Sequence, residues 1–519
     1  MKAVNSVKPK TKRFGGLLIL VVLVGLACRL TSPTPDSWSG TSTSDDIESI
    51  ATAIANTRLA NPSTAEVILI TPLAPGTETP VETTPQAVKT STPAGPWLVY
   101  SAPGGDELHA YDISLDDTDV INLPEPILST DLVAGRAPDG GMLIVRAGSV
   151  QNVDELALYQ IDVTSAQVTK ISPLLSLSLQ RNIVNQESQR ALQTLEAVTR
   201  PDGIAWSPNG RFLAFTAALD NDSSDLYVFD TLNQRIERVN GLFTHNTSPF
   251  WSPDSNWLIS QEIAFQSQSE SWRVENVLKL HVPGYDDQNT LYLPEHESKE
   301  EVFLGWVNSK NFISYSLTAS GPSSLRETHI ESLQSTIIFP GQFTQAAFDF
   351  DSSSLAFILD EAHAALSGLT AGVYLLQSGT TDYNLFRAGG WHQLTWEAGG
   401  SFIAASSQGV LAFSSDGEEM FLPGEGGACF SPGGNWLVAW GDGELTNAGV
   451  RLYQPPSSRP LQILTDTLTN TCLWQADSKG FFLFGEGSLY RFIFPGLEQQ
   501  LIENGFSDQK ELELIWLTR

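Results

Sequence analysis

The side chains that most often carry out catalysis or bind metals do not have the spacings that such sites need. The seven histidines show no His-x-His or His-Glu-x-x-His spacing, and no Cys/His zinc pattern is present. The Gly-x-Ser-x-Gly motif of serine hydrolases is also absent. The sequence therefore predicts no catalytic residues, no metal ligands and no cofactor. The histidines are His109, His245, His281, His296, His329, His363 and His392.

Two short segments contain residue types that can bind ions. Asp220–Asp225 supplies several oxygen ligands, but it lacks the glycine and the distal glutamate of a helix–loop–helix calcium site. Gly424–Gly427 is rich in glycine, yet it precedes a strand, whereas phosphate-binding loops open a helix. The first segment is predicted to be an acidic turn, and the second a turn between sheets.

The charge of the chain narrows the classes of partner. The 59 acidic residues outnumber the 29 lysines and arginines and give a net charge of −30. Such a surface repels phosphate backbones and anionic lipid headgroups, so we expect neither nucleic acid nor a general membrane surface as a partner. The 41 glycines and 29 prolines indicate a fold with many turns.

A short motif recurs along the chain and indicates the elements that position these side chains. An apolar strand, a Ser-Pro turn and a second apolar strand occur at Ile204–Phe215, Phe250–Ile259 and Cys429–Val438. Weaker copies lie between them, and the aromatic residues that end the first strands are 34 to 55 residues apart. These structural repeat anchors are Trp206, Trp251, Trp306, Phe348, Trp396, Phe430, Trp474 and Trp516. This period with several strands in each unit predicts an all-β propeller.

These repeats resemble the TolB-type, WD40-like Ser-Pro-Asp-Gly repeats of exported bacterial proteins. The resemblance covers roughly residues 97–519 and implies the fold. It implies no particular function, because one propeller fold serves many functions.

The two ends of the repeat region complete one another. Glu513–Trp516 has the pattern of a first strand with nothing after it, and Trp97–Ser101 begins a unit that lacks its first strand. Joining them closes the ring, and we predict a single propeller of about eight four-stranded blades, with seven to nine allowed. Residues 174–199 interrupt the repeat as a helical insertion, with one helix expected over 180–198. This insertion is either a partner-binding element or a tolerated surface addition.

The first 27 residues predict export. Five basic residues precede an apolar run over 14–27, which has the length of a signal peptide and is shorter than a membrane-spanning helix. Cys28 follows a small residue, Ala27, as in a bacterial lipoprotein signal, so Cys28 is the candidate lipidation site. An uncleaved signal anchor is the other interpretation. In both, the protein faces outward from the cell membrane and contacts it through the N-terminal anchor only.

Residues 28–96 are rich in Ser, Thr and Pro and predict a stalk, since they bury too little apolar surface to fold. A short helix over 45–58 is possible within it. Cys429 lies one residue before its anchor and Cys472 lies two residues before its own, in neighbouring repeats. Because side chains alternate between the faces of a strand, this difference favours buried free thiols over a disulfide.

Two classes of function fit these observations. The first is an extracytoplasmic, membrane-tethered propeller that acts as an interaction or scaffold module for a protein or polymer partner in the cell envelope. The second is a propeller enzyme, a lyase or glycosidase, with acidic residues at the central channel. A pair of carboxylates about 5–10 Å apart in an open cleft would favour the enzyme.

Overall fold

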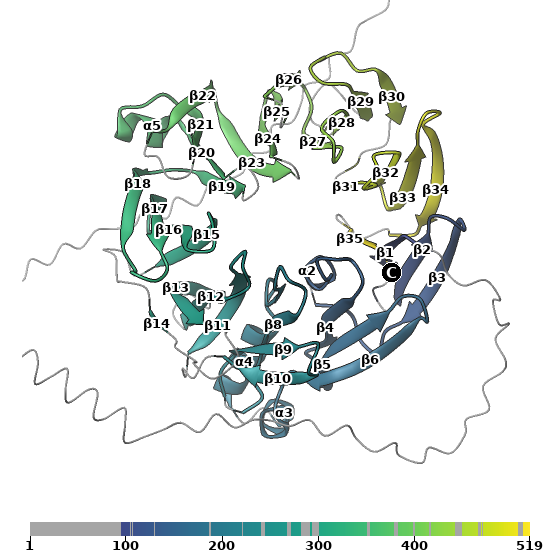
Figure 1. The fold of residues 1–519 in the computed structure, drawn as a ribbon, viewed down its shortest axis with the longest axis vertical. Coiled ribbons are helices and arrows are strands. Elements are labelled where there is room, and N and C mark those ends of the chain that lie inside the picture. Colours follow the sequence, from purple (N-terminus) through teal and green to yellow (C-terminus); the bar gives the residue numbers. More distant parts are fainter. Residues whose placement is uncertain are drawn as a thin grey trace, which may run out of the picture. The chain divides into compact units, whose positions relative to one another are not determined.

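The computed structural model describes most of residues 95–518, with short gaps of which the longest are 282–290, 293–299 and 442–448. The predicted signal segment 1–27, the lipidation candidate Cys28 and nearly all of the stalk 28–96 lie outside the described residues. The described part of the chain is a β-propeller (Figure 1).

The described residues form nine blades, which we number along the chain. Blade 1 contains β1 (Trp97–Ser101), β2 (Glu107–Asp112), β3 (Asp117–Asn122) and β35 (Leu514–Leu517), and blade 2 contains β4 (Leu143–Ser149), β5 (Asn152–Asp162) and β6 (Gln167–Pro173). Blade 3 contains β7 (Ile204–Trp206), β8 (Phe212–Ala217), β9 (Asp225–Asp230) and β10 (Arg235–Arg238). Blade 4 contains β11 (His245–Trp251), β12 (Trp257–Gln266), β13 (Ser271–His281) and β14 (Leu291–Tyr292). Blade 5 contains β15 (Glu301–Trp306), β16 (Asn311–Thr318), β17 (Gly321–His329) and β18 (Ser335–Gln342).

The remaining blades follow the same order. Blade 6 contains β19 (Gln345–Asp349), β20 (Ser354–Leu359), β21 (Gly372–Gln377) and β22 (Asn384–Ala388). Blade 7 contains β23 (Trp391–Glu397), β24 (Ser401–Ser406), β25 (Gly409–Phe413) and β26 (Glu419–Pro423). Blade 8 contains β27 (Gly427–Phe430), β28 (Leu437–Trp440), β29 (Val450–Tyr453) and β30 (Gln462–Thr465). Blade 9 contains β31 (Thr471–Trp474), β32 (Gly480–Gly485), β33 (Ser488–Ile493) and β34 (Glu498–Asn504).

The blade count of nine in the described chain lies at the upper end of the predicted range and one above its central value. The additional unit is blade 2, whose sheet has three strands. The place of its first strand is taken by a single bridge between Arg136 and Leu143. An alanine, Ala137, stands near this bridge, so the unit has no aromatic anchor and its repeat is hard to recognise in sequence.

The chain termini close the ring as predicted. β35 at the C-terminal end pairs antiparallel with β1, with Trp97 opposite Leu517 and Tyr100 opposite Leu514. Ile515 and Leu517 are buried in the same apolar cluster as Trp97 and Val99. One blade is therefore assembled from strands more than 400 residues apart in the chain, and the ring has no free sheet edge at this point.

Four helices occur in the described residues: α2 (Asp131–Ala134), α3 (Leu177–Val184), α4 (Gln189–Val198) and α5 (Glu361–Ser367). The insertion at 174–199 is helical, but it forms α3 and α4 where we expected a single helix. The Ser176 and Ser188 hydroxyls cap the two starts by accepting from Leu179 N and Ala191 N. Both helices bury apolar side chains in the cluster of blades 2 and 3, so the insertion completes that core.

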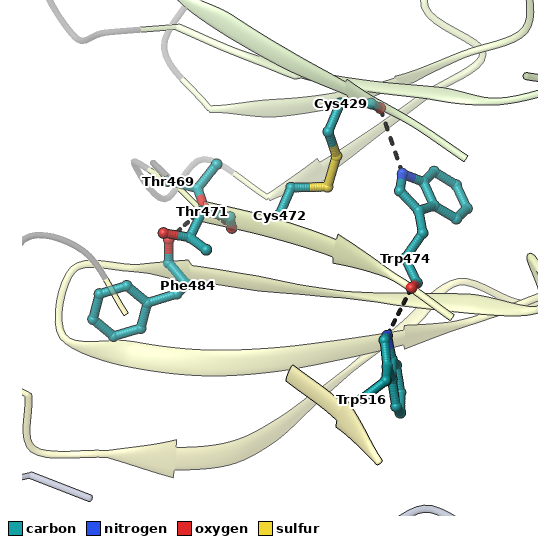
Figure 2. Close-up of a disulfide and its surroundings, with 7 residues drawn as sticks. All are labelled: Cys429, Thr469, Thr471, Cys472, Trp474, Phe484 and Trp516. Carbon is teal, nitrogen blue, oxygen red and sulfur yellow. Dashed lines mark hydrogen bonds between the residues drawn. A yellow bond between two sulfur atoms is a disulfide. The ribbon is translucent and has the colours of Figure 1, made fainter. Parts of the chain in front are cut away.

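The expectation of free thiols was wrong, because Cys429 and Cys472 form a disulfide with Cα atoms 6.4 Å apart (Figure 2). Anchor side chains point toward the preceding blade: Trp474 Nε1 donates to the Cys429 carbonyl. Cys472 shares that face of β31, whereas Cys429 lies one residue before the anchor Phe430 and points toward the following blade. The two cysteines stand at different distances from their anchors, so Cys429 points toward the following blade and Cys472 toward the preceding one. Because the two blades are neighbours, the cysteine side chains meet. The alternation of side chains along a strand decides which residues share a face of one sheet. It does not exclude a contact between side chains of two different sheets.

No helix in the described ranges has the length and apolar composition required to cross a bilayer.

Candidate functional site

The Ser-Pro motif builds a rigid turn at one end of the first strand in blades 3, 4 and 8. In blade 3 the Ser207 hydroxyl donates to Asn209 Oδ1 (2.7 Å) and accepts from Phe212 N (2.9 Å). In blade 4 the Ser252 hydroxyl makes the same pair of bonds, to Asp254 Oδ1 and Trp257 N. Each buried serine thus closes its own turn, and the turns define one rim of the ring.

Six of the anchors are tryptophans, and each joins its blade to the one before it through an indole N–H. Trp251 Nε1 donates to the Ala205 carbonyl at 3.1 Å, and Trp306 Nε1 donates to the Phe250 carbonyl at 3.3 Å. The other bonds of this kind run from Trp206 to Gly135, Trp396 to Ala347, Trp474 to Cys429 and Trp516 to Trp474. Phe348 and Phe430 have no N–H, and Phe348 instead packs against Gly305, where a Cβ would come within 2.8 Å of its ring.

Four successive anchors line an apolar groove of about 510 Å³. Trp206, Trp251 and Trp306 form most of its length, across blades 3, 4 and 5, and Phe348 of blade 6 is the fourth. The indole N–H groups of the three tryptophans are already bonded to backbone carbonyls, so these side chains present only carbon surface. The rest of the lining is Ala205, Pro208, Pro249, Phe250, Pro253, Phe303, Leu304 and Gly305. Among the described residues no lining side chain carries a charge, and the groove lies beside the turns that contain Pro208 and Pro253. We call it the anchor groove.

In blade 7 the position of the turn serine is occupied by an acidic residue. Glu397 follows the anchor Trp396, where Ser207, Ser252 and Ser431 stand in other blades. Burial raises the pKa of the Glu397 carboxyl to about 7, and among the described residues no neighbouring charge or hydrogen bond offsets this shift. An uncompensated carboxyl of this kind is costly unless something binds it.

Glu397 lines a cavity of about 290 Å³ between blades 7 and 8. Gln393, Thr395 and Glu397 alternate along β23 and share one face with Ile403 and Ala405 of β24. The opposite wall is Gly426, Gly427 and Ala428, which are too small to fill the space, together with Trp440. We call this cavity the Glu397 pocket.

The wall of the pocket on blade 8 is held by a buried ion pair. Glu425 is fully buried, accepts from Arg451 Nη1 at 3.0 Å and accepts from the Tyr453 hydroxyl at 2.8 Å. The Gly426 N–H donates to the Trp440 carbonyl at 2.7 Å. The Gly-rich segment is therefore a turn between two blades, as predicted, and its glycines leave the pocket open.

The titratable side chains on the first strands of the described blades lie at both ends of these strands. His245, Glu301 and His392 stand at or next to the starts of β11, β15 and β23, whereas Asp349 and Glu397 end β19 and β23. Because all first strands run in the same sense around the ring, the two groups lie toward opposite rims, about a strand length apart. Burial lowers the pKa of His245 to about 4, so this imidazole is neutral at physiological pH.

The carboxylates of the other segment, which was predicted to be an acidic turn, have partners within the protein. Asp220 accepts from Arg238 at 2.7 Å and from the Tyr227 hydroxyl at 2.7 Å, and Asp225 is buried 3.7 Å from the same arginine. No group of three or more His, Cys, Asp or Glu side chains suited to a metal occurs among the described residues.

Sequence reasoning missed both cavities. The anchor groove follows from four anchors side by side, which no single motif copy reveals. Aligned on the anchors, Glu397 is an acidic residue at a position that holds serine in the three clear copies, but Asp349 of blade 6 is acidic at the same position, so this pattern alone does not single out Glu397.

No protein-family model and no curated protein matches the chain. Solved structures do resemble it. A eukaryotic initiation factor is 12% identical, with a TM-score of 0.50 over 81% of this chain and 98% of that one. TolB from Acinetobacter baumannii is 13% identical, with a TM-score of 0.29 over 55% and 62%. An oligogalacturonate lyase in complex with manganese is 13% identical, with a TM-score of 0.33 over 56% and 88%. At these identities the likeness concerns the fold alone.

Proposed function

We propose that the chain is an interaction module, tethered by its N-terminus to the outer side of the cell membrane, that binds an extended apolar segment of a partner polypeptide in the anchor groove. The observation that carries this proposal is the groove itself, whose described lining consists of aromatic rings, prolines and other uncharged residues. Its volume of about 510 Å³ is in the range of natural ligand sites.

The chemistry of the groove favours a polypeptide over other polymers. A glycan needs donors and acceptors for its hydroxyls, but the three indole N–H groups of the groove are bonded to carbonyls within the protein. A nucleic acid would be repelled by a net charge of −30. Aromatic and proline surfaces are well suited to prolines and apolar side chains of an extended peptide.

The disulfide supports the extracytoplasmic part of the proposal. The bond between Cys429 and Cys472 joins blades 8 and 9, and disulfides persist mainly in oxidising compartments. This agrees with the export signal that the first 27 residues predict, and Cys28 is the proposed point of attachment.

Binding of uncharged peptides to the full chain tests the function. We expect peptides with prolines and apolar side chains to change the tryptophan fluorescence of the protein. Leu304→Glu should weaken this binding about tenfold or more, because it places a charge in the apolar groove. The matched control is Leu366→Glu, on the exposed face of α5, where Leu366 is 76% exposed. Equal binding by both variants, or turnover of glycans by the wild type without peptide binding, would overturn the proposal.

A further inference from the structure

The interface between blades 7 and 8 differs from the others in how it is filled. Gln393 and Thr395 lie three residues and one residue before the anchor Trp396, and both are exposed. The residues three and one before the anchors of blades 8 and 9 are buried or half-buried. Those residues are Gly427, Cys429, Thr471 and Leu473. The two first strands are therefore separated by open space at the Glu397 pocket, while a disulfide joins those of blades 8 and 9.

The side chains around this space are suited to accepting hydrogen bonds. Glu397 contributes carboxyl oxygens, Thr395 a hydroxyl and Gln393 an amide oxygen, all from one face of β23. The threonine lies between the two longer side chains, which can reach toward it. None of the lining residues is a lysine, arginine or histidine, so the described pocket holds no cation for the carboxylate.

These features define the ligand that the pocket lacks. An ammonium group carries three donors and one positive charge, which match three acceptors and one carboxylate. The net charge of −30 also raises the local concentration of cations. We propose that the Glu397 pocket binds a primary ammonium group of a small organic amine, held by Glu397, Thr395 and Gln393.

The pocket is less suited to the main alternative, a neutral sugar. Sugar sites usually offer the face of an aromatic ring, and the part of the Trp440 indole that lies against Gly427, where a Cβ would come within 2.6 Å of it, cannot stack on a sugar. This contact leaves the pocket with oxygen acceptors from β23 opposite a wall of small residues.

The proposal predicts that binding depends on pH. Because burial raises the pKa of Glu397 to about 7, the carboxyl must lose a proton to pair with an ammonium group near neutral pH. Glu397 is the only titratable residue that lines the described pocket, and the nearest acid of the facing wall, Glu425, is paired with Arg451. Ammonium binding should therefore strengthen from pH 5.5 to pH 8 and release protons near pH 7.

Calorimetric titration of the full chain with n-butylammonium tests this inference. We expect a Kd on the order of 1 mM at pH 8, and no measurable binding of the neutral analogue n-butanol. Glu397→Gln should weaken n-butylammonium binding about tenfold, because it removes the charge but keeps the shape. Glu397→Ser, which restores the serine of the repeat, should do the same.

The matched control is Glu419→Gln on β26 of the same blade, whose partner is the exposed Arg387. This variant should bind n-butylammonium like the wild type. The proposal fails if the wild type does not bind the amine, if Glu397→Gln binds it equally well, or if methyl glucoside binds more tightly. These results are independent of peptide binding in the anchor groove, so either proposal can fail alone.

Discussion

The disulfide between blades 8 and 9 gives a prediction whose size follows from the chain. Cys429 and Cys472 are 43 residues apart, and closing a loop of this length removes entropy from the unfolded chain. The chain-entropy relation gives about 4 kcal/mol at 25 °C for such a loop. We therefore expect reduction of the bond to lower the free energy of unfolding by up to about 4 kcal/mol.

Urea denaturation with and without dithiothreitol measures this effect. The control is the Cys429→Ala/Cys472→Ala double variant, in which stability should be reduced and should no longer respond to the reductant. Peptide mapping of the oxidised protein should recover the two cysteines in one linked peptide. A wild type whose stability is unchanged by the reductant, or free thiols at both positions, would refute the assignment and remove one support for export.

Four further predictions concern the blades and the anchor. Asp131→Ala should lower the free energy of unfolding by about 3–5 kcal/mol in urea denaturation, because it leaves the fully buried Arg146 guanidinium without its carboxylate. The control Glu155→Ala breaks the exposed pair with Lys170 and should lower it by less than about 1 kcal/mol. Trp251→Phe should cost about 1–3 kcal/mol in the same assay by leaving the Ala205 carbonyl without its N–H donor, and a cost near zero would contradict the role of the anchors. Glu397→Gln should stabilise the protein at pH 8 but hardly at pH 4.5. The reason is that the raised pKa of Glu397 makes the wild type lose stability as the pH rises from about 4.5 to 7. An equal gain in melting temperature at both pH values would contradict this. Cys28→Ser should release the protein from membranes in fractionation, and unchanged retention would leave an uncleaved signal anchor as the tether.

The sequence was sufficient for the architecture because its repeat is local. The turn at Ser207–Gly210 is determined by side chains within five residues, and strands such as 225–230 were predicted at their observed bounds. Ring closure was also predictable, because residues 513–516 and 97–101 each lack the strand that the other supplies. Blade 2 was the difficult case, since Ala137 gives no aromatic signal and one bridge replaces a strand.

The candidate sites could not be predicted in the same way, because they lie between blades. Whether Gln393 is exposed depends on the small residues Gly426 and Gly427 in the next unit, and not on its own strand. The disulfide shows the same dependence, since the faces of Cys429 and Cys472 meet only when two sheets are placed side by side. Alignment of all units on their anchors captures part of this information, since it places the acids Glu397 and Asp349 where the three clear copies have serine.

The central claim, that the anchor groove binds a polypeptide, is tested most directly by photo-crosslinking in cells. A photoreactive phenylalanine analogue would replace Leu304 in the groove or, as a control, Leu232, which is 75% exposed in the turn between β9 and β10. We predict a defined polypeptide adduct from position 304 and none from position 232. Adducts of equal yield at both positions, or no polypeptide adduct at position 304, would contradict the claim.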